Sequence, residues 1–214
     1  MINNDEINDI IRILEECYPE PVCALGHYKD YELLFATRLA AQCTDERVDT
    51  ITPVLFGKYA TLDAIAGAEI PDVEDIIHSC GFFRAKARDI VAAASMIIND
   101  FGGRVPDTME NLLKLPGVGR KTANLILGDV YGKPAVVVDT HCIRLTNRIG
   151  LADTKDPVKI ETVLRGALPP DKSSDFCHRL VLHGRAVCTA RNPDCGGCRI
   201  SGHCKSHRPG SRLE

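Results

Sequence analysis

Two side chains that could do chemistry, a lysine and an aspartate, stand eighteen residues apart in the segment 115–149. Lys121 follows a glycine-rich turn, and Asp139 stands at the entrance of a predicted helix. A lysine amine is a nucleophile once it has lost its proton, and a carboxylate can take a proton or stabilise positive charge. We therefore treat both as candidate catalytic residues. The alternatives are a solvated helix lysine and an aspartate that only caps the helix.

The turn before Lys121 contains two glycines, Gly117 and Gly119, separated by one residue. Glycine accepts positive φ and permits the close approach of another molecule, so this spacing predicts a tight turn. Apolar residues then recur at helical spacing, which predicts a helix that begins near Gly119. Arg120 stands where a nucleotide-binding loop of the G-x4-G-K-[ST] type requires glycine, so the segment is not such a loop.

Four of the ten cysteines form a C-x6-C-x2-C-x5-C pattern within seventeen residues: Cys188, Cys195, Cys198 and Cys204. This segment is rich in glycine and poor in apolar residues, so a metal centre is the economical way to hold it together. Zinc and an iron–sulfur cluster both accept four thiolates, and the spacing leaves both open. We interpret the other six cysteines as small buried hydrophobic residues: Cys17, Cys23, Cys43, Cys80, Cys142 and Cys177.

The chain of 214 residues has 44% hydrophobic and 26% charged residues, as is typical of a globular protein. It has no apolar signal core and no run long enough to span a membrane, so we expect a soluble intracellular protein. The net charge of −3 is unevenly distributed. Residues 1–100 carry 8 basic and 18 acidic residues, whereas residues 114–148 carry 6 and 2, and residues 165–214 carry 9 and 4. The two basic regions indicate a local surface for an anionic partner, although solvated basic faces would give the same counts.

Helical periodicity runs through almost every segment, so the predicted fold class is all-α. Asp107 and Glu110 have the spacing of a capping box, and Asp156 before a proline predicts another helix start. Only the run 135–138 resembles a strand, and four residues alone make no sheet. The turn at residues 132–134 is the predicted domain boundary.

Three motifs together resemble the endonuclease III family, which consists of helix-hairpin-helix DNA glycosylases with abasic-site lyase activity. They are LPGVGRKTA at residues 115–123, VDTH at residues 138–141 and the four-cysteine pattern. Further family-like segments, LAAQCTD, GFFRAKA and LHGR, occur in the same order, so the resemblance extends across nearly the whole chain. Each short motif is modest alone, but the three in this order are highly specific.

The resemblance implies a two-lobed, all-α helix-hairpin-helix glycosylase fold. Residues 22–132 would form a six-helix barrel domain that carries the hairpin. Residues 1–21 and 133–214 would form a discontinuous helical domain with a [4Fe-4S] cluster. Damaged double-stranded DNA would lie across the cleft between the lobes, with one base flipped out. The cluster ligands would be Cys188, Cys195, Cys198 and Cys204.

The resemblance also implies roles for single residues. Lys121 matches the nucleophile that attacks C1′ of the damaged nucleotide and forms a Schiff base. Asp139 would relay the lysine proton or stabilise positive charge on the sugar. Gln42 and Phe82 match the residues that fill the space left by the flipped base. Phe82 stands where the family commonly has an aliphatic residue, and an ordinary core aromatic is the alternative interpretation.

The loop between Cys188 and Cys195 resembles a phosphate-contacting loop of the family, with basic Arg191 and acidic Asp194. The acidic residue makes this loop less basic than is usual in the family. The other expected DNA contacts are Gly117, Val118, Gly119, Arg120, His141 and Arg144.

The implied function is base-excision repair, with removal of oxidised pyrimidines from duplex DNA and cleavage of the abasic site by β-elimination. The alternatives are a non-catalytic DNA-binding or redox-sensing protein and a related glycosylase with other base specificity. The presence of both Lys121 and Asp139 argues against a non-catalytic protein. The lysine also argues against an adenine glycosylase of the same superfamily, because those enzymes lack it and carry an extra C-terminal domain. We expect a monomer in the cytoplasm, associated with the nucleoid through DNA and without membrane contact.

Overall fold

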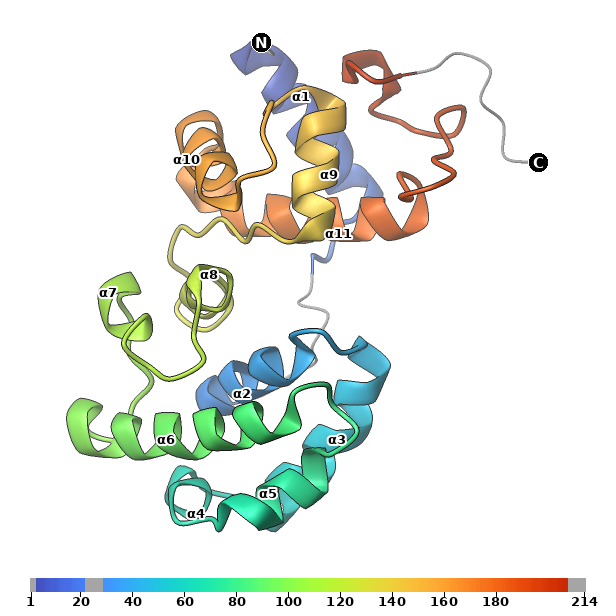
Figure 1. Ribbon diagram of the computed structural model, residues 1–214. Coiled ribbons are helices and arrows are strands. Elements are labelled where there is room, and N and C mark those ends of the chain that lie inside the picture. Colours follow the sequence, from blue (N-terminus) through green and yellow to red (C-terminus); the bar gives the residue numbers. More distant parts are fainter. Residues whose placement is uncertain (1–2, 22–28, 208–214) are drawn as a thin grey trace. The chain divides into compact units, whose positions relative to one another are not determined.

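In the computed structural model, every secondary-structure element among the described residues is a helix (Figure 1), which confirms the predicted all-α class. The structure describes residues 3–21 and 29–207, and these ranges contain no strand. None of the helices within them is long and apolar enough to cross a membrane. The α-helices are α1 (Asn4–Cys17), α2 (Asp30–Ala40), α3 (Asp45–Lys58), α4 (Leu62–Ala66), α5 (Ile70–Ile77), α6 (Phe83–Phe101), α7 (Met109–Leu112), α8 (Arg120–Asp129), α9 (Thr140–Ile149), α10 (Pro157–Ala167) and α11 (Ser173–Ala186), with 3₁₀ helices η1 (Pro170–Lys172) and η2 (Ser201–His203).

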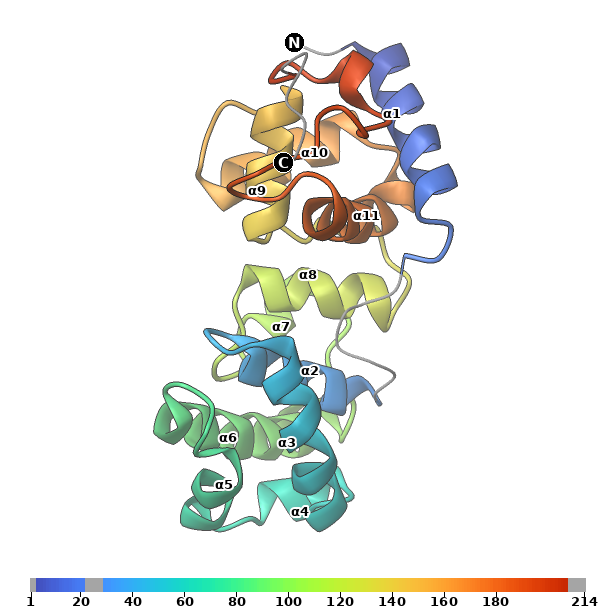
Figure 2. The same ribbon diagram turned by 90° about the vertical axis from the view of Figure 1, so that its right-hand side faces the viewer.

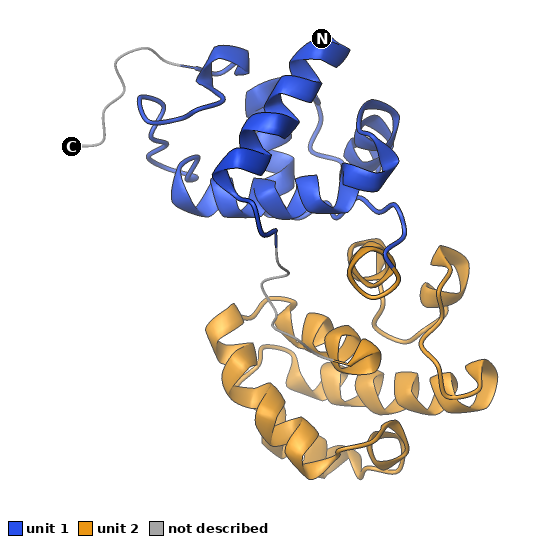
Figure 3. Ribbon diagram, turned by 180° about the vertical axis from the view of Figure 1, so that it is seen from behind, with its two compact units in different colours: residues 1–22, 132–214 blue, residues 23–131 orange. Residues whose placement is uncertain are grey.

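The chain divides into two compact units (Figure 3). Unit 1 consists of Met1–Val22 and Gly132–Glu214, so it is built from both ends of the chain. Unit 2 is the continuous segment Cys23–Tyr131. Among the described helices, α2 to α8 belong to unit 2, and α1 and α9 to α11 belong to unit 1.

The long helix α6 is the centre of unit 2, because α2, α4 and α5 all pack against it. Its buried residues, among them Ile90, Ala94 and Ile97, recur at helical spacing. Full burial of an isoleucine contributes about 1.5–3 kcal/mol. The helix ends at Gly102, whose φ of 62° lies in the left-handed region that glycine adopts readily. Helix α2 also contacts α8, so the same core supports the later helices of the unit.

Unit 1 joins helices from the two ends of the chain around α11, which contacts both α1 and α9 (Figure 2). The buried residues of α1 lie on one face of that helix, as its amphipathic sequence predicts. They share a core with apolar residues of α9 and α11, which explains why α1 belongs with the C-terminal half. This core includes Ile10, Leu14, Leu145, Phe176 and Leu180.

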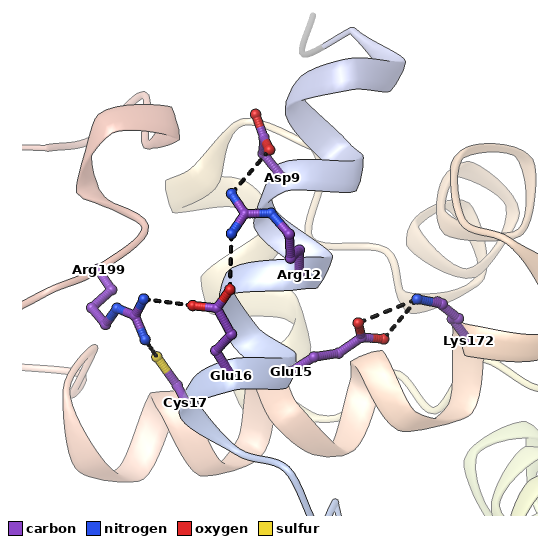
Figure 4. Close-up of polar contacts among 7 residues, drawn as sticks. All are labelled: Asp9, Arg12, Glu15, Glu16, Cys17, Lys172 and Arg199. Atoms are coloured by element: carbon purple, nitrogen blue, oxygen red, sulfur yellow. Dashed lines mark hydrogen bonds and ion pairs between the residues drawn. The ribbon is translucent and has the colours of Figure 1, made fainter.

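A row of ion pairs on the surface of unit 1 ties α1 to the segment after α11 (Figure 4). Arg12 donates to Glu16 within α1 at 2.9 Å. Glu16 also accepts a 2.6 Å hydrogen bond from Arg199, and the guanidinium groups of Arg199 and then Arg12 lower the pKa of its carboxyl. Arg199 lies 3.6 Å from Sγ of Cys17 as well. Exposed pairs contribute little stability each, but together these contacts fix the path of the segment beside α1.

The helix starts follow the predicted caps only in part. Asp156 caps α10 as predicted, accepting hydrogen bonds from two backbone N–H groups of the first turn. The predicted capping box of Asp107 and Glu110 is wrong, because Thr108 is the N-cap of α7 and its hydroxyl accepts the N–H three residues on. The strand predicted at 135–138 is wrong too. Its residues are buried, but no described segment pairs with their backbone to form a sheet.

The six cysteines outside the pattern were all predicted to be buried, but their exposure to solvent differs. Burial is confirmed for Cys80, Cys142 and Cys177. It is wrong for Cys17 and Cys43, which are half-exposed because each stands at a helix end or shortly after one. The remaining one, Cys23, lies outside the described residues.

Candidate functional site

The predicted glycine turn joins α7 to α8 in unit 2. The N–H of Val118 donates to the carbonyl of Leu115 at 3.1 Å and closes the turn. Gly119 is the N-cap of α8 and provides no side-chain cap. Because the first N–H groups of a helix have no partner within it, they can bind an outside acceptor. The turn therefore presents backbone donors at the positive end of α8, an arrangement that suits an anion such as phosphate.

Gly117 makes the closest packing contact of this turn, with a φ of 74°. A Cβ atom there would lie 2.6 Å from Nε of Arg38 and 2.8 Å from Oδ2 of Asp89. These two residues form a partly buried ion pair between α2 and α6, with Nη2 and Nε of Arg38 at 2.6 and 2.9 Å from Oδ2. The turn rests directly on this pair, and only glycine leaves room for the contact.

Lys121 lies in the first turn of α8 with an exposed side chain. The buried face of the helix carries Ala123, Ile126 and Leu127, so the lysine lies on the face away from the core. An accessible amine thus lies next to the backbone donors of the turn.

Asp139 is the N-cap of α9 in unit 1, and its Oδ1 accepts the N–H of Cys142 at 2.7 Å. The predicted capping role is confirmed. The residue is partly exposed, and capping uses one carboxylate oxygen, which leaves the other for a second partner. Lys121 and Asp139 belong to different units, and each is described within its own.

Gln42 and Phe82 share an uncommon backbone conformation. They have φ values of 54° and 59°, and they are the non-glycine residues with positive φ in the described chain. This conformation costs a non-glycine residue about 1–2 kcal/mol and is found preferentially at functional sites. Phe82 is 69% exposed, so the alternative interpretation as a core aromatic is wrong. A Cβ at Gly81 would lie 3.3 Å from the carbonyl oxygen of Gln42, so the two turns lie side by side.

Two arginines of α9 hold the start of the cysteine segment. Arg144 donates to the carbonyl oxygens of Gly184 and Cys188 at 3.0 and 3.1 Å, and its Nη2 lies 3.1 Å from Nδ1 of His141. Arg148 donates to the Thr189 carbonyl at 2.7 Å and lies 3.3 Å from Sγ of Cys188. The guanidinium of Arg144 therefore has a structural task in unit 1. Its expected contact with DNA stays a prediction.

The four cysteines of the pattern are all half-exposed. Burial, supplemented by the neighbouring thiols of Cys188, Cys204 and Cys195, raises the pKa of Cys198 to about 11. Four cysteines gathered in one short segment can bind an iron–sulfur centre once their thiols have lost their protons. In the described part of the chain no three His, Cys, Asp or Glu side chains converge on a position for a single metal ion.

The acidic residue of the loop 189–194 has a structural role that its charge did not suggest. The Asp194 carboxylate accepts the N–H of Gly197 at 3.0 Å and so organises the turn between Cys195 and Cys198. A Cβ at Gly197 would lie 2.5 Å from that carboxylate. Arg191 remains exposed on the same loop, as its predicted contact with phosphate requires.

Comparisons with known proteins agree with these features. Residues 35–170 match the family model described as HhH-GPD superfamily base excision DNA repair protein, and residues 188–204 match the iron-sulfur binding domain of endonuclease III. Endonuclease III of Synechocystis sp. is 46% identical over 199 residues, which cover 92% of this chain and 91% of the relative. Endonuclease III of Bacillus subtilis is 37% identical over 206 residues, with 96% and 94% covered.

A solved structure of a trapped endonuclease III–DNA covalent intermediate is 36% identical, with a TM-score of 0.90 over 97% of this chain and 98% of that one. The hairpin and the helical fold therefore define a base-excision DNA repair protein of the HhH-GPD superfamily. Within this superfamily the chain belongs to the endonuclease III family of DNA glycosylases and abasic-site lyases. Its segment 188–204 is the iron–sulfur binding domain, for a [4Fe-4S] cluster.

The packing of the turn predicts a large effect of Gly117→Ala on stability. The substitution should lower the free energy of unfolding by about 2 kcal/mol or more, because alanine disfavours positive φ and its Cβ would clash with the ion pair. Gly102→Ala is the matched control, since Gly102 has a φ of 62° and nothing within 4 Å of a Cβ. Gly102→Ala should lower the free energy of unfolding only by the cost of a positive φ in alanine, about 1 kcal/mol. Urea unfolding measures both, and equal losses would contradict the packing argument.

Proposed function

We propose that this protein removes oxidised pyrimidines from duplex DNA and cleaves the abasic site by β-elimination, through a Schiff base on Lys121. The observation that carries the proposal is an exposed lysine in the first turn of α8, directly after a turn whose backbone donors suit a phosphate. A relative that is 36% identical has been solved as a trapped covalent intermediate with DNA, which is the kind of species that a nucleophilic side chain forms.

Damaged double-stranded DNA is the proposed partner. The backbone N–H groups at the start of α8, at Gly119 and Arg120, would hold a phosphate of the strand, and Gly117 and Val118 would lie beside it in the turn. Extruding the damaged nucleotide costs a few kcal/mol, and less for a damaged base than for an intact one. The strained, exposed positions of Gln42 and Phe82 suit residues that enter the duplex, and an aromatic ring can stack on the neighbouring bases.

The reaction follows from the chemistry of a deprotonated amine. Nζ of Lys121 attacks C1′, and the glycosidic bond breaks as the base leaves with its electron pair. Nζ loses both of its protons as the C1′–O4′ bond opens to give an imine, and the departing base and O4′ each gain one proton in exchange. Removal of a proton from C2′ then expels the 3′ phosphate and breaks the strand. Asp139, held in place by its cap on α9, takes the lysine proton or stabilises the positive charge on the sugar.

We further propose that Cys188, Cys195, Cys198 and Cys204 are the ligands of the [4Fe-4S] cluster. When bound, the cluster cross-links four thiolates in a segment that has few apolar residues to form a core. Arg148 would place its positive charge beside the Cys188 thiolate. Arg191 and His141 would contact the DNA backbone, and Arg144 would support the same region from inside unit 1.

The domain assignment is part of the proposal. Residues 22–132 would form the six-helix barrel domain with the hairpin, and residues 1–21 and 133–214 the iron–sulfur domain. The protein would act as a monomer in the cytoplasm, associated with the nucleoid and without membrane contact. The compact units of the chain are compatible with this division.

The lysine assignment predicts the result of borohydride trapping. Wild-type protein mixed with a duplex that contains an abasic or thymine glycol site should be trapped covalently by sodium borohydride, because the reagent reduces the imine. Lys121→Gln should give no covalent complex. Lys114→Gln is the matched control, since it removes an exposed lysine near the same turn and should leave trapping intact. Trapping that persists in Lys121→Gln would contradict the assignment.

Asp139→Asn separates chemistry from capping. Asparagine is as good an N-cap as aspartate, so the free energy of unfolding should change little. The rate of base release under single-turnover conditions should fall about 10²–10⁴-fold, because the carboxylate charge and its proton-accepting oxygen are lost. A stable Asp139→Asn protein with the wild-type rate would show that the residue is only a cap.

The charge distribution predicts a steep salt dependence of DNA affinity. The logarithm of the association constant should fall with the logarithm of salt concentration by about 0.9 for each phosphate neutralised. Arg191→Ala should reduce this slope by about 1, whereas Arg12→Ala, on the exposed surface of α1, should not change it. Fluorescence anisotropy with a labelled duplex measures both, and a flat dependence would contradict the proposed basic footprint.

The ligand assignment predicts that iron content depends on the four cysteines. Purified wild-type protein should contain iron and acid-labile sulfide in equal amounts, and Cys198→Ser should lose most of both. Cys17→Ser, a half-exposed cysteine outside the pattern, should retain them. Zinc in place of iron in the wild-type protein would contradict the assignment of a [4Fe-4S] cluster.

A further inference from the structure

Two thiols of unit 2, Cys43 and Cys80, lie against each other although they are far apart in sequence. Their Sγ atoms are 3.7 Å apart. A disulfide bond has a length of about 2.05 Å, so its formation would need a movement of about 1.6 Å between the sulfurs. Cys80 is 1% exposed, whereas Cys43 is half-exposed. One thiol of the pair can therefore be reached from solvent, and the second lies directly behind it.

The backbone around the pair is also close. The N–H of Cys43 donates to the Ala40 carbonyl at 3.1 Å, just after α2, and the N–H of Cys80 donates to the Ile77 carbonyl at 2.8 Å, at the end of α5. Between them, a Cβ on Gly81 would approach the carbonyl oxygen of Gln42 to 3.3 Å. A covalent link between the sulfurs would thus join two turns that are already in contact.

Two cations lie within electrostatic reach of the pair. The ammonium of Lys86 is buried in α6, where it donates to the Leu39 carbonyl at 2.8 Å, and Arg47 lies in the first turn of α3. Burial and the hydrogen bond to Cys43 raise the pKa of Cys80 to about 11, and these two cations oppose that shift. Because the pKa of Cys80 stays raised, the accessible thiol of Cys43 is the one placed to react first, with Cys80 directly behind it.

We propose that Cys43 and Cys80 form a reversible modification site, in which a small disulfide oxidant such as oxidised glutathione converts the pair to an intramolecular disulfide. Cys43 attacks one sulfur of the oxidant, its S–S bond breaks, and one glutathione leaves with the Cys43 proton. Cys80 then attacks the Cys43 sulfur, and the second glutathione leaves with the Cys80 proton. Two electrons pass from the cysteine pair to the oxidant, which is reduced to two thiols.

The link would act on the turns that carry Gln42 and Phe82. Cys43 directly follows Gln42, and Cys80 stands two residues before Phe82. The disulfide would fix the separation of the two turns. This consequence rests on the proposed function, because it matters for activity only if these residues enter DNA. We expect base release by the oxidised protein to be about tenfold slower, since small displacements of positioning groups have large effects on rate.

The modification itself is tested without DNA. Cluster-loaded protein is treated with oxidised glutathione, its remaining thiols are alkylated, and it is digested with trypsin. We expect peptides 39–47 and 59–84, which contain Cys43 and Cys80, to be joined by a disulfide that a reductant removes. Cys80→Ala should give no such link, and Cys43 should keep one glutathione instead.

Cys142 and Cys177, whose thiols hydrogen-bond to each other, are the internal control. These residues are 0% and 1% exposed and should stay reduced. If no link forms between Cys43 and Cys80, and the alkylating reagent labels Cys43 after the treatment, the proposal is overturned. Equal oxidation of Cys142 and Cys177 would show that the reaction is not selective for Cys43 and Cys80.

The effect on activity is measured separately with a thymine glycol duplex. Oxidised wild-type protein should be slower and recover fully on reduction, while the rate of Cys43→Ala, which keeps only the buried thiol of Cys80, should not respond to the oxidant. A link that forms without a change in rate would refute the regulatory consequence. If untreated protein does not act on the duplex at all, the proposed function fails, while the peptide result still decides whether the pair is a modification site.

Discussion

The position of the hairpin on unit 2 depends on one packing contact, between Gly117 and the ion pair of Arg38 and Asp89. The pair bridges α2 and α6, and the turn lies against its charged atoms with no room for a side chain. Because Lys121 follows four residues later, in the first turn of the helix that the hairpin starts, the same contact sets where the amine lies. An ion pair with no part in the chemistry thus supports the proposed reaction.

In unit 1, polar side chains position the segment that follows α11. The segment after α11 has few apolar residues, so its path is fixed by hydrogen bonds to backbone carbonyls. Arg144 and Arg148 supply them from α9, and Arg199 ties the segment to α1. Asp194 closes the turn between two of the cysteines. The guanidinium of Arg148 beside the Cys188 thiol suits a cluster whose ligands are negatively charged.

Much of the fold and part of the candidate site could be predicted from the sequence. Helical periodicity predicted the all-α class, and glycine spacing predicted the turn before Lys121, because both signals are local. The strain at Gln42 and Phe82 could not be predicted, since neither residue type marks a positive φ. The pair of Arg38 and Asp89 joins residues that are distant in sequence, and no local pattern indicates it. Charge counting gave no sign that Asp194 organises the turn before Gly197, because a hydrogen bond to a backbone N–H depends on the local geometry and not on net charge.

The proposed reaction requires a bond between the amine of Lys121 and C1′ of the damaged nucleotide. Mass spectrometric sequencing of the borohydride-reduced complex tests it most directly, because it locates the modified nitrogen. We expect a sugar adduct on Lys121 alone. An adduct on the α-amino group or on another lysine would contradict it.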